Sequence, residues 1–414
     1  MIKLVILHYL PIEYYPPVTN LIDYLASERV GDIKQVKVYS THNVKGREEY
    51  QVSRYKYQDL KKIVDKEIDR SSLIIKRSPF PKESDNSLTR LLKYLHYNLL
   101  TLIGLIIYRP NDLLYYESYS AWPVYIYTKY FNRKCRLFIH FHEYASKDWY
   151  ATTMKQVQYF HRLEKKWLYP RAQWISQTNN DRLQFFHNDH PYIKEEQLRV
   201  MPNYPSKDWL KVKGEGYKEK GTKLTPTPST LNLKPVKLVY VGSLSFQSTY
   251  LRELCEWVLN QNGQVLFDIY AYNLYEDVKS YLKGLNSAWV NYYEQGVEYN
   301  EQPKLLAQYD VGLILYKAHN QNYTYNAPNK LFEYLACDLD VWYPNVLQGP
   351  KPYDTTTTYP KVIPVDFEHL DVFDWRKAIN NDGCKYKASD YFCEEVYKEL
   401  VDEIVGKKLI GKRN

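Results

Sequence analysis

The sequence has few of the residues that mark disulfide scaffolds or structural metal centres. Its 414 residues include five scattered cysteines: Cys135, Cys255, Cys337, Cys384 and Cys393. An odd number of cysteines without a Cys-x-x-Cys pair argues against a disulfide framework and against a zinc ribbon. We therefore expect a reduced, cytosolic compartment and no bound metal.

Long hydrophobic runs are also missing. The opening residues, MIKLVILHYL, lack the extended apolar core and cleavage site of a secretory leader. The longest apolar run, 99–108, is too short to span a bilayer, which takes about 20 residues. It ends a segment, 88–108, whose leucines recur at helical spacing with Arg90, Lys93 and His96 between them. Two interpretations stay open: a helix packed on a sheet, or an amphipathic helix touching a membrane.

Glycine is scarce and tyrosine abundant, with 15 Gly against 44 Tyr. The tyrosine excess fits sugar stacking, membrane-interface contact or simple compositional bias. Residues 1–200 carry 31 Lys and Arg against 21 Asp and Glu, whereas the remainder carries 25 against 27. The basic first half predicts an anionic partner, either a membrane surface or a phosphate-linked lipid. Since no nucleic-acid recognition motif is present, we expect no nucleic-acid partner.

Short β-rich runs alternate with helical stretches, a pattern typical of parallel α/β sheets. The predicted strands are 3–7, 113–117, 137–142, 174–177, 236–244, 266–270, 311–315 and 340–343. The predicted helices are 18–27, 88–108, 250–259, 276–284, 302–308, 328–337 and 390–405.

Composition divides the chain in two. Residues 204–234, rich in Lys, Gly, Pro, Ser and Thr, predict a linker or mobile loop. They separate a first Rossmann-like domain, 1–203, from a second, 235–388. The last segment, 389–414, contains a further helix, and the family resemblance described below implies that this helix packs back on the first domain. Ligands of such sheets bind at the carboxyl ends of the strands.

The most informative segment is 326–343, NAPNKLFEYLACDLDVWY. Pro328 suits the first turn of a helix, and Lys330 and Glu333 then share one face of it. The amino end of a helix offers free N–H groups and a positive dipole to a diphosphate. Lys330 adds charge, and Glu333 can accept hydrogen bonds from ribose hydroxyls. The alternative is an exposed ion pair without a ligand.

This segment resembles the C-terminal signature of family 4 of the GT-B glycosyltransferases, N-K-x-x-E-Y-x-A-x-G-x-P-V. The matching positions are Asn329, Lys330, Glu333, Tyr334, Ala336 and Val341. The segments 236–244 (VKLVYVGSL) and 296–312 (GVEYNEQPKLLAQYDVG) resemble further parts of the family's donor domain. The segments FIHFHE, WISQTNND and VMPNY agree more loosely with its first domain. The resemblance implies the GT-B fold, in which two Rossmann-like α/β domains face each other across a cleft.

The resemblance also implies an activity: a hexosyltransferase that moves a sugar from a nucleotide-sugar donor with retention, without metal or other cofactor. The family favours a glycan or lipid-linked acceptor in bacterial surface polysaccharide synthesis. It favours a cytoplasmic enzyme, with a peripheral position on the inner face of the membrane left open. The first domain would bind the acceptor and the second the donor.

By the same resemblance, individual residues receive roles. The donor-binding candidates are Gly242, Ser243, Tyr325, Asn326, Asn329, Lys330 and Glu333. His142 is a catalytic candidate by this resemblance, and Glu143, the carboxylate next to it, is the second catalytic candidate. For His140 and His142 a purely structural role stays open, and for Tyr325 and Asn326 a plain loop role. His140 and His142 lack a third ligand at a telling spacing, so we expect no metal site there.

The sequence departs from the family pattern in the charge around the diphosphate. No cation follows the turn GSLSFQSTY before Arg252, and Tyr325 stands where members often have a second Glu. Arg252 and Lys317 are candidates for the missing charge. Two other functions stay open: a GT-B nucleotide-sugar epimerase, with Glu143 as its carboxylate, and a catalytically idle glycan-binding or scaffold member.

Overall fold

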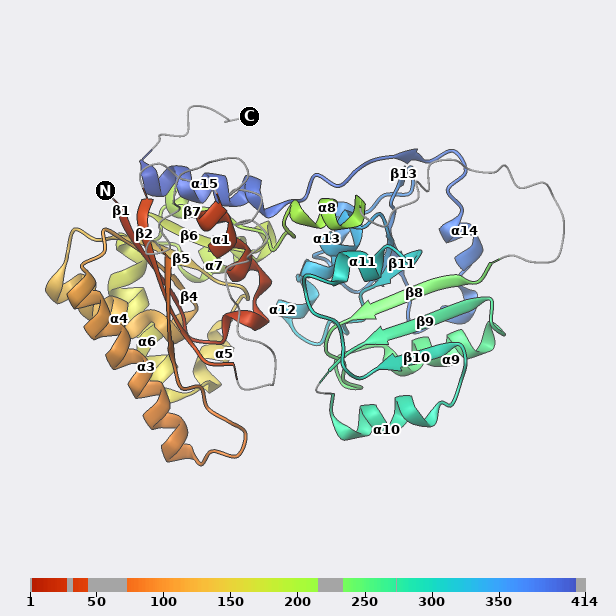
Figure 1. The fold of residues 1–414 in the computed structure, drawn as a ribbon, viewed down its shortest axis with the longest axis horizontal. Helices are drawn as coiled ribbons and strands as arrows, with labels where there is room; N and C mark the ends of the chain where they lie inside the picture. Colours follow the sequence, from red (N-terminus) through yellow and green to blue (C-terminus); the bar gives the residue numbers. More distant parts are fainter. Residues whose placement is uncertain (1, 28–32, 44–72, 215–233, 273, 407–414) are drawn as a thin grey trace, which may run out of the picture. The chain divides into compact units, whose positions relative to one another are not determined.

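The computed structural model describes residues 2–27, 33–43, 73–214, 234–272 and 274–406. The chain forms two compact units, each built on its own parallel sheet (Figure 1). Unit 1 comprises Met1–Asn203 with Cys393–Asn414, and unit 2 comprises Tyr204–Phe392.

Unit 1 contains a seven-stranded sheet in the order β3-β2-β1-β4-β5-β6-β7, with every neighbouring pair parallel. Its strands are β1 (Ile2–His8), β2 (Ile33–Thr41), β3 (Leu73–Ser78), β4 (Asp112–Tyr116), β5 (Arg136–His140), β6 (Trp174–Gln177) and β7 (Leu198–Val200). The strand order reverses between β1 and β4. The carboxyl ends of these two strands therefore flank the topological switch point, where α/β sheets bind ligands.

Helices surround this sheet in the order expected for crossover connections. They are α1 (Pro16–Ser27), α3 (Ser87–Tyr108), α4 (Ala121–Ile126), α5 (Lys147–Thr152), α6 (Lys155–Leu163), α7 (Asn180–Asp189) and α15 (Cys393–Val405). Two π-helical turns follow α4 and α6, namely η4 (Tyr127–Phe131) and η5 (Glu164–Leu168). Short 3-10 turns are η1 (Ile12–Tyr14), η3 (Ser118–Ser120), η6 (Tyr169–Arg171) and η7 (Glu195–Gln197).

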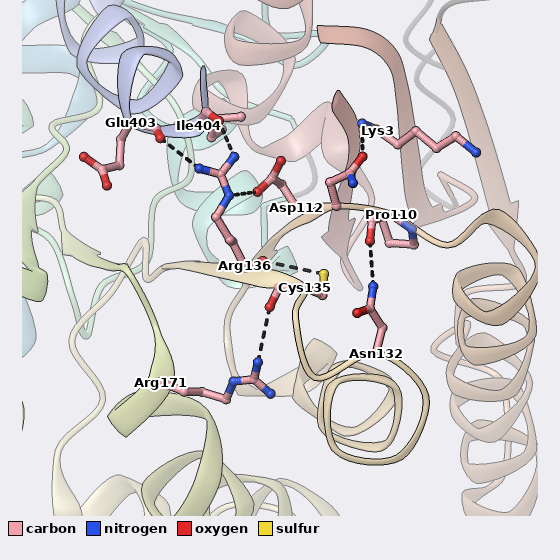
Figure 2. Close-up of polar contacts among 10 residues, drawn as sticks. Lys3, Pro110, Asp112, Asn132, Cys135, Arg136, Arg171, Glu403 and Ile404 are labelled. Atoms are coloured by element: carbon pink, nitrogen blue, oxygen red, sulfur yellow. Dashed lines mark hydrogen bonds and ion pairs between the residues drawn. The ribbon is translucent and has the colours of Figure 1, made fainter. Parts of the chain in front are cut away.

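The helix α15 belongs to unit 1 although it follows unit 2 in the sequence. The buried hydroxyl of Tyr397 donates to the carbonyl oxygen of Pro17 at 2.6 Å. At the other end of α15, the Arg136 guanidinium pairs with Asp112 at 2.5 Å and donates to the carbonyls of Glu403 and Ile404 (Figure 2). A cation at the last carbonyls of a helix satisfies their free acceptors and complements the dipole.

Unit 2 contains a six-stranded parallel sheet in the order β10-β9-β8-β11-β12-β14. Its strands are β8 (Val236–Val241), β9 (Val265–Tyr270), β10 (Val290–Tyr293), β11 (Val311–Leu313), β12 (Asp340–Pro344) and β14 (Val362–Val365). Its helices are α8 (Asp208–Gly214), α9 (Leu251–Asn260), α10 (Glu276–Gly284), α11 (Gln302–Leu306), α12 (Gln321–Thr324), α13 (Asn329–Ala336) and α14 (Trp375–Ile379). The short turns η8 (Lys351–Tyr353) and η9 (Leu370–Val372) and the strand pair β13 (Thr358–Tyr359) and β15 (Lys385–Tyr386) complete it. The strand order reverses between β8 and β11, which is the switch point of unit 2.

The structure corrects several sequence expectations. The segment expected to be a linker contains α8, and Trp209 in it is buried beside Tyr299 in the core of unit 2; residues 215–233 lie outside the described residues. The strand expected at 113–117 ends at Tyr116, and the one expected at 137–142 ends at His140. Both differences place polar residues directly beyond strand ends, where they can meet a ligand.

Candidate functional site

The turn after β8 requires glycine at position 242. Gly242 has a φ of +135°, and a Cβ atom built on it would lie only 2.7 Å from Nζ of Lys330. An L side chain would be strained in this backbone conformation and would also displace the lysine. The sequence therefore brings a backbone turn and an ammonium group together across 88 positions of the chain.

Lys330 connects the two strands of the switch point. Its Nζ donates to the hydroxyl of Tyr316 at 3.0 Å and lies over the ring of Tyr240 at 5.0 Å. Tyr240 belongs to β8, and Tyr316 follows β11. Lys330 itself stands in the first turn of α13, where N–H groups have no partner within the helix. A cation, a helix amino end and an open turn at one switch point form an arrangement suited to a phosphate group.

Glu333 lies one turn further along α13. Its side chain is half-buried, and burial raises its pKa to about 7, although the nearby Lys330 charge opposes the shift. Pro328 is the residue that precedes this helix, not a member of its first turn as expected. The Lys330–Glu333 spacing on one helical face is as the sequence predicts.

The remaining donor-site candidates lie around the same elements. Ser243 is exposed directly after Gly242, and its carbonyl accepts from the Tyr240 hydroxyl at 2.7 Å. Tyr325 and Asn326 form the turn between α12 and α13, with backbone N–H groups bound to Gln321 and Tyr323. Asn329 is the first residue of α13.

The two cations named as substitutes for the missing charge have other partners. Lys317 pairs with Glu253, with 2.7 Å between Nζ and Oε1. The Arg252 guanidinium lies 4.0 Å from the centroid of the Phe246 ring. Both cations therefore contact residues on or beside α9. Lys330, by contrast, packs on the Gly242 turn.

Unit 1 presents a different cluster at the carboxyl ends of its strands. His8 ends β1, His140 ends β5, and His142 lies two residues beyond. The His142 ring lies 5.0 Å from that of His140 and 5.5 Å from that of His8, and the rings of Tyr15 and Tyr116 both stack on it at 4.9 Å. Burial lowers the pKa of His8 to about 4 and of His140 to about 3, and it also lowers the pKa of His142 well below its ordinary value. All three imidazoles are therefore neutral at physiological pH.

Several polar atoms of this cluster are buried without a hydrogen-bond partner in the described part of the chain. They are Nε2 of His8, Nε2 of His140, both ring nitrogens of His142 and the hydroxyl of Tyr116. Because buried polar atoms are nearly always paired in folded proteins, such a group indicates a place for a polar ligand or water. The described residues contain no group of three or more His, Cys, Asp and Glu placed to hold a metal ion.

Glu117, at the end of β4, completes the cluster and was missed from the sequence. Its backbone has φ 57° and ψ 154°, a strained region that is populated almost only by glycine. One carboxylate oxygen accepts from the His142 N–H at 2.7 Å, and burial raises the pKa of this carboxyl to about 8. Glu143 is exposed, and its N–H also binds the Glu117 carboxylate. The missed signal was an acidic residue directly after a buried strand.

The sequence matches no family model, and no curated protein sequence matches it. Solved structures do match over nearly the whole chain. A lipopolysaccharide outer core galactosyltransferase, WaaB, aligns at a TM-score of 0.56 and 12% identity, covering 98% of this chain and 99% of its own. Sucrose-phosphate synthase from Thermosynechococcus elongatus aligns at 0.57 and 11% identity, with 98% and 95% covered. UDP-GlcNAc 2-epimerase from Neisseria meningitidis, bound to UDP-GlcNAc, aligns at 0.54 and 12% identity, with 98% and 100% covered. The chain has the GT-B fold.

The two Rossmann-like units of this GT-B chain carry different chemistry at equivalent edges. The edge of unit 2 offers a cation and the amino end of a helix, which attract a phosphate. The edge of unit 1 offers neutral imidazoles, phenols and a carboxyl, which exchange hydrogen bonds with hydroxyl groups.

Proposed function

We propose that the chain is a glycosyltransferase that moves a sugar from a nucleotide-sugar donor to a hydroxyl of a glycan or lipid-linked acceptor. In this proposal unit 2 binds the donor and unit 1 binds the acceptor. The observation that carries it is the Lys330 ammonium packed on the Gly242 turn at the switch point of unit 2. The shared fold with WaaB and sucrose-phosphate synthase supports it.

The chemistry follows from these groups. The acceptor oxygen bonds to the anomeric carbon while the bond from that carbon to the diphosphate oxygen breaks. Lys330 and the first N–H groups of α13 stabilise the charge that grows on the departing diphosphate, and Glu333 accepts from the ribose hydroxyls. In a retaining reaction the leaving phosphate oxygen takes the acceptor proton, so no protein base and no metal is needed. Family 4 membership and a role in bacterial surface polysaccharide synthesis complete the proposal, supported by the N-K-x-x-E-Y motif.

His142 would orient the reacting sugar or acceptor in this scheme. Both of its ring nitrogens are buried and unpaired within the described residues, and its lowered pKa keeps one of them an acceptor. Glu143, the other catalytic candidate, is exposed, and its N–H helps to hold Glu117.

A nucleotide-sugar epimerase is the second candidate. It is favoured by Glu117, a half-buried carboxyl with a raised pKa beside three histidines, since epimerisation needs groups that add and remove protons. The fold shared with UDP-GlcNAc 2-epimerases is equally compatible with it. An idle scaffold member is the third candidate.

The test is thermal stabilisation by a panel of nucleoside diphosphates and nucleotide sugars, on wild type, Lys330→Met and Lys304→Met. Lys304 is an exposed lysine on α11 and serves as the matched control. A donor at about 100 times its Kd should stabilise the wild type and the control by about 2.7 kcal/mol, and Lys330→Met by far less. Equal stabilisation of both variants would contradict the proposed donor site. If no compound of the panel stabilised the wild type, that result would favour the scaffold function.

The donor identified in this way then separates the two enzymes. Incubation without acceptor should leave a transferase's donor unchanged apart from slow hydrolysis. An epimerase would convert it into an isomeric nucleotide sugar, visible by NMR of the anomeric proton. Release of nucleoside diphosphate that depends on added acceptor supports the transferase.

A further inference from the structure

The helix α3 exposes a continuous row of large apolar side chains. The exposed members are Leu88, Leu92, Leu95, Leu99, Leu100, Ile103 and Ile107. Most of them recur at intervals of three or four residues, which places them on one side of the helix. Exposure reaches 65% at Leu88 and 76% at Ile107, so the row extends along the whole length of about 33 Å.

The opposite side of α3 is anchored in unit 1. Its buried residues are Tyr94, Tyr97, Asn98, Thr101, Leu105 and Tyr108. The Tyr94 hydroxyl donates to the carbonyl of Tyr119 at 2.8 Å, and α3 packs beside α4 (Figure 1). By length and composition alone α3 could cross a membrane. The folded unit 1 does not allow α3 to cross a membrane, because the helix would have to leave the unit and break the contacts of its buried polar side.

Exposed aromatic side chains lie near the carboxyl end of α3, on the turn η4 that contacts this helix. Tyr130 and Phe131, at the end of η4, are 63% and 56% exposed. The next residue, Asn132, donates from Nδ2 to the carbonyl of Pro110 at 3.3 Å, two residues beyond α3 (Figure 2). Exposed tyrosine and phenylalanine beside an apolar helix face are typical of the level where acyl chains meet headgroups.

Basic residues outnumber acidic ones around this surface, although Asp85, just before α3, pairs with Lys93, and Asp112 pairs with Arg136. The segments 87–111 and 118–142 contain no Asp or Glu, although they contain Arg90, Lys93, Arg109, Lys129, Arg133, Lys134 and Arg136. Arg133 and Lys134 are exposed directly beside the aromatic pair. Basic groups at the rim of an apolar surface attract anionic lipid headgroups. A second copy of the chain would instead bring the same cations against one another, with no acidic residue on α3 to neutralise them.

We propose that α3 with the Tyr130–Phe131 turn is a membrane-docking surface, which lies in the plane of an anionic bilayer and inserts its leucine row among the acyl chains. The inference concerns the folded chain and does not depend on the proposed activity. Of the two interpretations of the 88–108 segment, it favours membrane contact. The buried side of the same helix attaches the surface to unit 1.

Vesicle flotation tests this proposal, using the full chain with phosphatidylcholine vesicles and with vesicles that contain phosphatidylglycerol. The variants are Leu99→Ser with Ile103→Ser, and Arg133→Gln with Lys134→Gln; Tyr275→Ser with Val372→Ser, exposed apolar positions of unit 2, is the matched control. We expect wild type and control to float with anionic vesicles. The leucine-row variant should bind at least tenfold more weakly, and the charge variant about tenfold more weakly at low salt. Circular dichroism melts should show that all variants remain folded, because every substituted side chain is exposed.

A tryptophan reporter supplies the second measurement. Leu99→Trp should show a blue-shifted emission and quenching by lipids brominated in the acyl chain, whereas Tyr275→Trp should show neither. Equal flotation of wild type and the leucine-row variant would overturn the proposal. So would a wild-type dimer in sedimentation that the leucine-row substitutions dissociate, since that would assign the surface to a second copy.

Discussion

Unit 1 and unit 2 use the same strand order around their switch points and place opposite chemistry there. In unit 2 the edge combines Gly242, Lys330 and the amino end of α13, all suited to negative charge. In unit 1 the equivalent edge holds neutral His8 and His142 with Glu117. Parallel sheets therefore determine where a ligand binds, whereas the residues just beyond each strand determine which ligand.

The two edges also differ in how they are held. Unit 2 keeps its turn open by omitting a side chain at Gly242. Unit 1 packs rings together and tolerates a strained backbone at Glu117, whose carboxyl group accepts from the N–H groups of His142 and Glu143. Strain of this kind persists only where the surrounding structure imposes it, and it gathers at functional sites. The predictions below test this contrast from the largest expected effect to the smallest.

The largest effect should come from Glu117→Gln, measured as the free energy of unfolding at a series of pH values. Burial raises the folded-state pKa of Glu117 to about 8 from an ordinary value of 4.5, so the folded protein holds a proton that the unfolded chain has lost. The stability due to this group is therefore complete below about pH 4.5 and is lost as pH rises through 8. Relative to wild type, Glu117→Gln should gain about 2–4 kcal/mol between these limits in urea titrations. Glu256→Gln, exposed on α9, is the control, and a gain independent of pH would contradict the assigned burial.

The next effect should come from Gly242→Ala in unit 2. The added methyl group meets Lys330 Nζ at 2.7 Å in a backbone conformation that disfavours L residues. We expect a loss of about 2 kcal/mol in donor binding by calorimetry, with a smaller loss of folding stability. Gly284→Ala is the matched control, because nothing lies within 4 Å of its added carbon. Unchanged donor affinity in Gly242→Ala would show that the Gly242 turn is not part of the donor-binding site.

The sequence predicted those features of the two units that depend on local patterns. The bounds of α10 at 276–284 and the shared face of Lys330 and Glu333 follow from helical spacing. It did not predict β2 and β3, whose lysines and arginine interrupt the apolar pattern, nor α8, which lies in a segment of linker-like composition.

Long-range packing explains the rest of what was missed. The contact of Lys330 with Gly242 joins residues far apart in the sequence, and the importance of Glu117 depends on its backbone angles. The helical periodicity of 88–108 was compatible with packing on the sheet and with membrane contact. The burial of Tyr94 and Tyr97 in the structure shows which side of the helix remains exposed. Patterns along the chain carry no information on such pairings.

A smaller effect concerns the pH dependence of the proposed donor site. Since burial raises the Glu333 pKa to about 7, its carboxyl takes up a proton as pH falls below neutrality and can no longer accept from two ribose hydroxyls. Donor affinity of the wild type should fall by up to about tenfold between pH 7.5 and pH 6. Glu333→Gln should bind more weakly at pH 7.5 and show a flat profile. A parallel fall in both proteins would assign the titration to another group.

The smallest effect tests whether α15 contributes its stability to unit 1. Tyr397→Phe removes the buried hydrogen bond to the Pro17 carbonyl while keeping the ring, so it should cost about 1 kcal/mol of folding stability. Tyr275→Phe, at an exposed tyrosine of unit 2, should cost nothing measurable. Hydrogen exchange locates the loss: amides of β1 and α1 should exchange faster in Tyr397→Phe, and those of β8 and β9 should not. Faster exchange in unit 2 as well would show that α15 stabilises both units, and that the two edges do not have independent supports.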